Sequence, residues 1–133
     1  MFRLSHFTLL LATLLLLSGL SLVKAQPGTA DQRISEVYGS YTSKLTEAQV
    51  LELKARLLRC SVKQMPMQQG EQYPLLSSQP LVTKFVANLK PDNFTEPAGI
   101  NPLKYNLKFQ SREDVIYRID GTDYVLFVAG KAP

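Results

Sequence analysis

The chain has 133 residues, with 15 Lys and Arg against 11 Asp and Glu, one His and one Cys. The surplus of positive charge is small, and no basic stripe interleaved with aromatic residues occurs, which excludes a nucleic-acid partner from the expected functions. A single cysteine, Cys60, excludes a disulfide framework within the chain, so packing must stabilise the fold.

The first 25 residues have the organisation of an export signal. Arg3 and His6 form a short basic start, residues 7–22 form an apolar run, and Val23-Lys24-Ala25 has the compact side chains that signal peptidase requires. We predict cleavage between Ala25 and Gln26, and a periplasmic, extracellular or cell-surface location. The alternative is an uncleaved leader, which approaches the roughly 20 residues of a transmembrane helix and is the only membrane contact expected.

Removal of the leader limits the chemistry of the mature chain. Taking 25 from 133 residues leaves 108, which suits a single domain, and loss of Arg3 and Lys24 leaves 13 basic against 11 acidic residues. Because His6 lies in the leader, the mature chain has no Ser-His or Cys-His nucleophile pair and no histidine metal ligand. We therefore predict a non-enzymatic protein with no catalytic residue, metal or cofactor; an enzyme using only carboxylates or Tyr is a third alternative.

The mature chain is predicted to begin with a flexible linker, residues 26–31, followed by one domain, residues 32–133. Pro27 and Gly28 favour an irregular start. From about Asp31 to Tyr41, apolar residues at spacings of three and four predict a short helix, although Gly39 weakens that prediction.

A longer amphipathic helix is predicted from Glu47 to Lys63. Thr46 and Gln49 have the spacing of a capping box, and Glu52 lies four residues before Arg56 on the polar side. The expected apolar stripe consists of Val50, Leu53, Leu57 and Cys60, widened by Leu51, Leu58 and Val62.

Six prolines between residues 64 and 102 restrict regular structure to short pieces. The segment Leu81 to Leu89 fits a helical stripe or a strand, and its periodicity does not decide between them.

The carboxy-terminal third predicts strands. Leu103 to Gln110 alternates apolar and polar residues, and residues 115–119 and 122–128 follow as two strands joined by Asp120-Gly121, a dipeptide typical of a type I′ hairpin. In that register Arg118 opposes Asp123 and Tyr117 opposes Tyr124. The predicted fold class is α+β: one main amphipathic helix packed on an antiparallel meander of three or more strands.

The last strand, Tyr124 to Val128, is apolar on both faces although a simple meander leaves it at the sheet edge, where it can template pairing. Either Leu81 to Val86 or the amino-terminal segment covers it, or another chain does. We therefore predict a protein-interaction module that binds another envelope protein, or a second copy of itself, by strand addition. The candidate interaction surface is Tyr117, Tyr124, Val125, Leu126 and Phe127.

An alternative function uses the polar face of the sheet. Lys104, Lys108 and Arg118 are expected to form a cationic surface that binds an anionic glycan or a small ligand, with salt-sensitive affinity.

Two strings in this region, Asn101-Pro102-Leu103-Lys104-Tyr105-Asn106 and residues 115–125, resemble the tail of a group of small uncharacterised exported proteins of the Bacteroidetes. The resemblance covers about the last quarter of the chain. It implies a bacterial periplasmic or surface setting and brings no activity, cofactor or catalytic residue.

Overall fold

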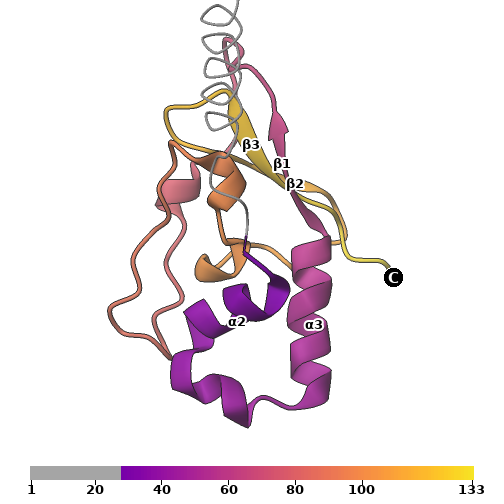
Figure 1. The fold of residues 1–133 in the computed structure, drawn as a ribbon. Helices are drawn as coiled ribbons and strands as arrows, with labels where there is room; N and C mark the ends of the chain where they lie inside the picture. Colours follow the sequence, from indigo (N-terminus) through magenta and orange to yellow (C-terminus); the bar gives the residue numbers. More distant parts are fainter. Residues whose placement is uncertain (1–27) are drawn as a thin grey trace, which may run out of the picture.

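The computed structural model describes residues 28–133 (Figure 1), so the predicted export signal lies outside the described residues. Two α-helices, α2 (Ala30–Tyr38) and α3 (Glu47–Leu58), pack with a three-stranded antiparallel sheet. Its strands are β1 (Cys60–Gln64), β2 (Val115–Arg118) and β3 (Tyr124–Val128), in the spatial order β1-β3-β2. The predicted α+β fold class is confirmed.

Both helices begin with a capping box. Thr46 Oγ1 accepts from the Gln49 amide at 3.2 Å, and the Gln49 side chain accepts from the Thr46 amide at 2.9 Å, as the spacing predicts. Thr29 and Gln32 make the same pair of bonds. Because this second box satisfies the free amides of the first turn, α2 begins at Ala30, within the segment predicted to be a linker.

Helix α3 ends at Leu58, and the prediction that it continues to Lys63 is wrong. Residues Cys60–Gln64 form β1, and all five pair with β3 in an antiparallel register. Leu51 and Leu58 do not widen the apolar stripe, since they are 67% and 87% exposed. Pairing with an apolar central strand outweighs the local helical periodicity, because only this pairing satisfies the backbone of β3 on that side.

The hairpin of β2 and β3 has a register two residues away from the predicted one: Tyr117 opposes Leu126 and Arg118 opposes Val125. A type I′ turn needs positive φ at both central residues, whereas in the described chain only glycines have positive φ, Gly121 at 68° among them. The Asp120 carboxylate instead accepts from the Ser77 amide at 3.1 Å and from the Ser77 hydroxyl at 2.5 Å. The predicted pairings of Arg118 with Asp123 and of Tyr117 with Tyr124 are therefore wrong.

The segment after the 3₁₀ turn Pro102–Lys104 is not a strand, contrary to the prediction. Successive three-residue turns form there, with the Leu107 amide bonded to the Tyr105 carbonyl and the Phe109 amide bonded to the Leu107 carbonyl, both at 2.9 Å. These turns preserve an alternation of apolar side chains inward and polar ones outward. The segment Leu81 to Leu89 is neither helix nor strand, and only Leu81 makes an isolated bridge, to Tyr105.

The core lies between the two helices, the segment 100–109 and one face of the sheet. It is formed by Ile34 and Val37 from α2, Leu53 from α3, Leu76, Ile100, Leu103, Tyr105, Leu107 and Phe109 from the connecting segments, and Tyr117, Ile119, Leu126 and Val128 from the hairpin.

Gly39, the residue directly after α2, provides a test of how closely residue 86 packs against the end of this helix. Its φ is +53°, and a Cβ added there would lie 2.9 Å from Val86 Cγ2. We expect Gly39→Ala to lower the free energy of unfolding by about 2–3 kcal/mol. The control Gly70→Ala also has positive φ but no atom within 4 Å of the added Cβ, so it should cost only about 1 kcal/mol in chemical denaturation. Equal losses in the two variants would contradict the close approach of residue 86 to α2.

Candidate functional site

Most of the predicted interaction surface on β2 and β3 is buried. Because β3 is the central strand, its edges are occupied by β1 and β2, and Tyr117, Val125 and Leu126 are at most 1% exposed. Tyr124 is 36% exposed, and Phe127 is half-buried. The element that covers the apolar strand is β1, rather than Leu81 to Val86 or the amino-terminal segment.

The predicted cationic surface is dispersed in a similar way. Lys104 and Arg118 are buried and satisfied by internal carboxylates, and only Lys108 is exposed. Two of the three cations expected to bind an anionic ligand are therefore withdrawn from solvent.

Arg118 holds the loop after β1 against the outer face of the hairpin. Its guanidinium donates to both carboxylate oxygens of Glu71, 2.8 Å from Nε to Oε2, and to the carbonyls of Met65 at 2.6 Å and Tyr124 at 3.3 Å. The hydrogen bonds from Arg118 keep the pKa of the Glu71 carboxyl below its usual value. This ion pair covers the second face of β3, where Val125 is fully buried.

Lys104 is the centre of a second polar network. Its Nζ lies 2.6 Å from Glu36 Oε1 on α2, 2.9 Å from Asp92 Oδ1 and 3.1 Å from the Lys90 carbonyl. Asp92 Oδ2 accepts from the Tyr105 hydroxyl and the Asn101 amide, both at 3.0 Å. Burial lowers the pKa of Lys104, but the bonds to Glu36 and Asp92 outweigh it and the net shift is upward, so the amine stays charged.

The outer edge of β1 is the unpaired edge of the sheet in the described part of the chain. The Ala129 amide donates to the Arg59 carbonyl, and the Met65 amide donates to the Asp123 carbonyl. In an antiparallel pair, every second residue directs its N–H and C=O toward the partner strand, so these two bonds show which residues of β1 face β3. Ser61 and Lys63 therefore direct their backbone groups toward β3, and the N–H and C=O of Val62 face outward. The opposite edge is partly covered, because the Arg118 amide donates to the Pro74 carbonyl at 2.8 Å.

A hollow of about 250 Å³ lies beside this open edge. Its walls are mainly apolar, with Arg33 as the one charged side chain, and they comprise Arg33, Cys60, Ser61, Val62, Ala98, Ile100, Pro102 and Leu126. Burial raises the pKa of the Cys60 thiol to about 11, so the thiol stays protonated at neutral pH and acts as an apolar wall. A neighbouring hollow of about 270 Å³ shares Arg33 and includes Leu57 and the exposed Leu58.

Comparisons with protein-family models, curated proteins and solved structures return no match. Within residues 28–133, no group of three or more His, Cys, Asp or Glu side chains is arranged to hold a metal ion. No helix of that same region is long and apolar enough to cross a membrane.

Sequence reasoning missed the β1 edge because Cys60 and Val62 also continue the apolar stripe of the predicted helix. The signal that could have found it is the alternation of apolar Cys60 and Val62 with polar Ser61 and Lys63, which fits a strand of period two. Glu71 carried no signal, because its partner Arg118 is 47 residues away in the chain.

The Glu71 to Arg118 pair predicts a pH dependence of stability. Because folding lowers the pKa of Glu71 from an ordinary value of 4.5, the pair stabilises the protein above that pH, and this stability is lost as the pH falls through the folded-state pKa. We expect Glu71→Gln to be less stable than the wild type at pH 7, with the difference vanishing under more acidic conditions. Urea unfolding across a pH series measures this.

The control is Glu113→Gln, at an exposed position with no ion pair in the described structure. It should track the wild type at every pH. A constant difference between Glu71→Gln and the wild type down to pH values well below 4.5 would contradict the role of the carboxylate charge.

Proposed function

We propose that this chain is a non-enzymatic, exported cell-envelope protein that acts as a protein-interaction module. Its site is the outer edge of β1, to which an extended segment of a partner protein adds as a further strand. The single observation that carries this proposal is that the outer edge of β1 pairs with no other strand among residues 28–133, whereas the other edge strand is partly covered by Pro74.

Strand addition needs main-chain groups that are free to bond and side-chain contacts that give specificity. The outward N–H and C=O of Val62 supply the first requirement. The hollow between β1 and residues 98–102 supplies the second, because alternate side chains of an added strand point toward the same face as Cys60 and Val62. An apolar partner side chain fits these walls, and an acidic neighbour fits Arg33.

Two features of β1 are typical of an edge strand: it is short, and its face away from the core is polar. Lys63 lies over the Phe127 ring, with its Nζ 3.9 Å from the ring centroid, and charged side chains of this kind limit indiscriminate edge pairing. A five-residue strand gives an added segment few main-chain bonds, so we expect the hollow to set the affinity.

The burial of Lys104 and Arg118 removes the support for a glycan-binding sheet face, so that alternative is not carried forward. Two features of the sequence support the proposed location outside the cytoplasm: the apolar leader at residues 1–25, and the resemblance of the carboxy-terminal strings to exported proteins.

Site-specific photo-crosslinking tests the proposal. A photoreactive phenylalanine analogue at the exposed position Gln64 should give an adduct of defined mass in the native envelope. Val62→Pro removes the outward N–H, a change that edge strands tolerate, and should abolish the adduct. Val62→Thr keeps both β-branching and the N–H, so it should retain the adduct.

Thermal unfolding of both variants confirms that they fold before the adducts are compared. An adduct that persists unchanged in folded Val62→Pro would overturn strand addition. Light scattering of residues 26–133 over a concentration series identifies the partner class: a dimer means that a second copy occupies the edge, and a monomer means that the adduct contains a different protein.

A further inference from the structure

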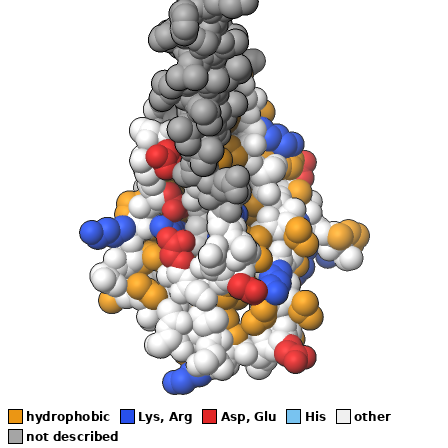
Figure 2. All heavy atoms as spheres, in the orientation of Figure 1, with side chains coloured by type: hydrophobic (Ala, Val, Ile, Leu, Met, Phe, Trp, Pro, Cys, Tyr) orange, Lys and Arg blue, Asp and Glu red, His pale blue; other side chains and the backbone are white. Residues whose placement is uncertain are grey.

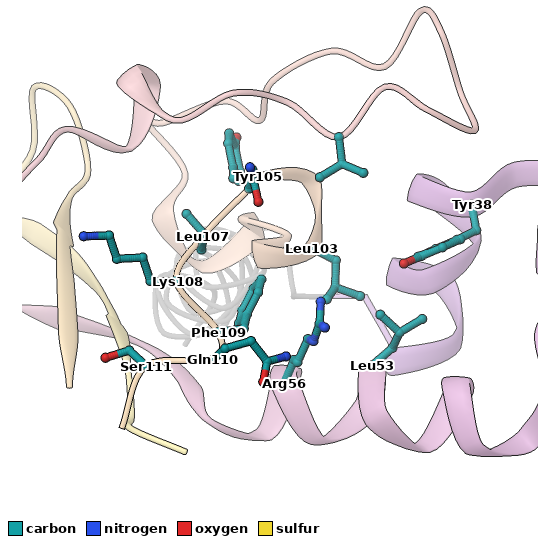
Figure 3. Close-up of a pocket in the computed structure, with 12 residues that line it drawn as sticks. Tyr38, Leu53, Arg56, Leu103, Tyr105, Leu107, Lys108, Phe109, Gln110 and Ser111 are labelled. Atoms are coloured by element: carbon teal, nitrogen blue, oxygen red, sulfur yellow. The ribbon is translucent and has the colours of Figure 1, made fainter. Parts of the chain in front are cut away.

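A larger cavity lies on a different part of the molecule, between α2, α3 and the segment 103–111 (Figure 3). Its volume is about 490 Å³, within the range of small-molecule sites. Tyr38, Leu53 and Leu103 form apolar walls, and Arg56, Asn106, Gln110 and Ser111 contribute polar groups. None of these residues lines the hollow beside β1.

Arg56 is the unusual residue of this cavity. Its Nε is buried and has no hydrogen-bond partner among the described residues, and it makes only a long ion pair with Glu52, 3.5 Å from Nε to Oε1. The guanidinium lies 5.2 Å from the centroid of the Phe109 ring and, in Figure 3, points between Phe109 and Leu103. A buried donor without an acceptor is costly. Because the Arg56 side chain lines the cavity, a ligand there can offer its guanidinium a hydrogen-bond acceptor.

The other polar groups around the cavity favour the same sign of ligand charge. Gln110 Oε1 accepts from Lys131 Nζ at 2.9 Å, which leaves the Gln110 amide N–H groups as donors. Lys108 adds a second positive charge to the lining, although Figure 3 shows its side chain extending away from Arg56. The cavity itself is lined by no carboxylate.

An adjoining cavity of about 480 Å³ extends the apolar walls. It shares Tyr38, Leu53 and Arg56 with the first and is bordered by Tyr41 and Phe85, whose rings stack with centroids 4.6 Å apart. Its charged residues besides Arg56 are Lys84 and Glu52, and Glu52 competes for the Arg56 guanidinium.

We propose that this cavity binds a small organic carboxylate. The carboxylate accepts hydrogen bonds from the Arg56 guanidinium and from the Gln110 amide, and the apolar body of the ligand lies on Tyr38, Leu53 and Leu103. One guanidinium fork between apolar walls matches a monocarboxylate with an apolar body better than a multiply charged, fully hydrated phosphate. This site is independent of the strand-addition edge.

Titration of the folded protein with 2-naphthoate, followed by NMR, tests the proposal. We expect saturable shifts at Tyr38, Leu103 and Phe109, with 2-naphthamide and inorganic phosphate binding at least about tenfold more weakly. Arg56→Met should weaken 2-naphthoate by at least about tenfold, because the charged hydrogen bonds are lost. Glu52→Gln should strengthen it about two- to fivefold, because the competing carboxylate is removed.

Lys90→Met is the matched control, since it also removes one positive charge and its side chain is exposed and outside the cavity. It should change the affinity by less than about twofold, as expected for a screened surface charge. Absence of saturable shifts in the wild type, or equal affinity in folded Arg56→Met, would overturn the proposal. Because Glu52→Gln acts in the opposite direction, loss of stability in Arg56→Met cannot mimic the full pattern.

Discussion

The structure depends on one constraint: β3 is apolar on both faces and must be covered on every side. Val125, Leu126 and Val128 are almost completely buried. The two edges of β3 are taken by β1 and β2, and one face packs on the core formed by the helices and the segment 100–109. On the face shown in Figure 2, hydrophobic side chains also lie on the surface, among charged ones.

Two buried cations of the carboxy-terminal half hold the segments that cover β3 in place. Arg118 ties the loop after β1 to the second face of β3 through Glu71, and Lys104 ties α2 to the segment around Asp92. If either residue left its ion pair to bind an external ligand, its internal carboxylate partner would become a buried, unpaired charge, which is costly. Neither residue is therefore available for binding. The features left for function are the main-chain edge of β1 and the Arg56 cavity, where donors have no hydrogen-bond acceptor among residues 28–133.

Local patterns predicted the start of α3 and several short-range features. The capping box at Thr46, the ion-pair spacing of Glu52 and Arg56, and an alternation of buried and exposed residues over 105–110 are all present. Each depends on neighbours within about one or two turns of chain, which a sequence displays directly. The fold class followed from these local signals.

Contacts between distant segments could not be read in the same way. The helix ends at Leu58 because the next residues pair with a strand more than 60 residues later. At the hairpin turn, the Asp120 carboxylate accepts a hydrogen bond from Ser77, 43 residues earlier in the chain. The cations Lys104 and Arg118 look like a surface in sequence because their carboxylate partners lie in irregular loops and on α2. For the same reason, the sequence indicated β3 as the strand with an open edge, whereas in the structure that strand is β1.

Amide hydrogen exchange along β1 tests the central claim most directly, that β1 rather than β3 is the open edge of the sheet. The ladder alternation predicts slow exchange at Ser61 and Lys63, whose amides face β3, and fast exchange at Val62, whose amide faces solvent. Uniform protection from Cys60 to Lys63 in a monomeric sample would contradict the account, because it would mean that the helix continues or that the edge is already covered.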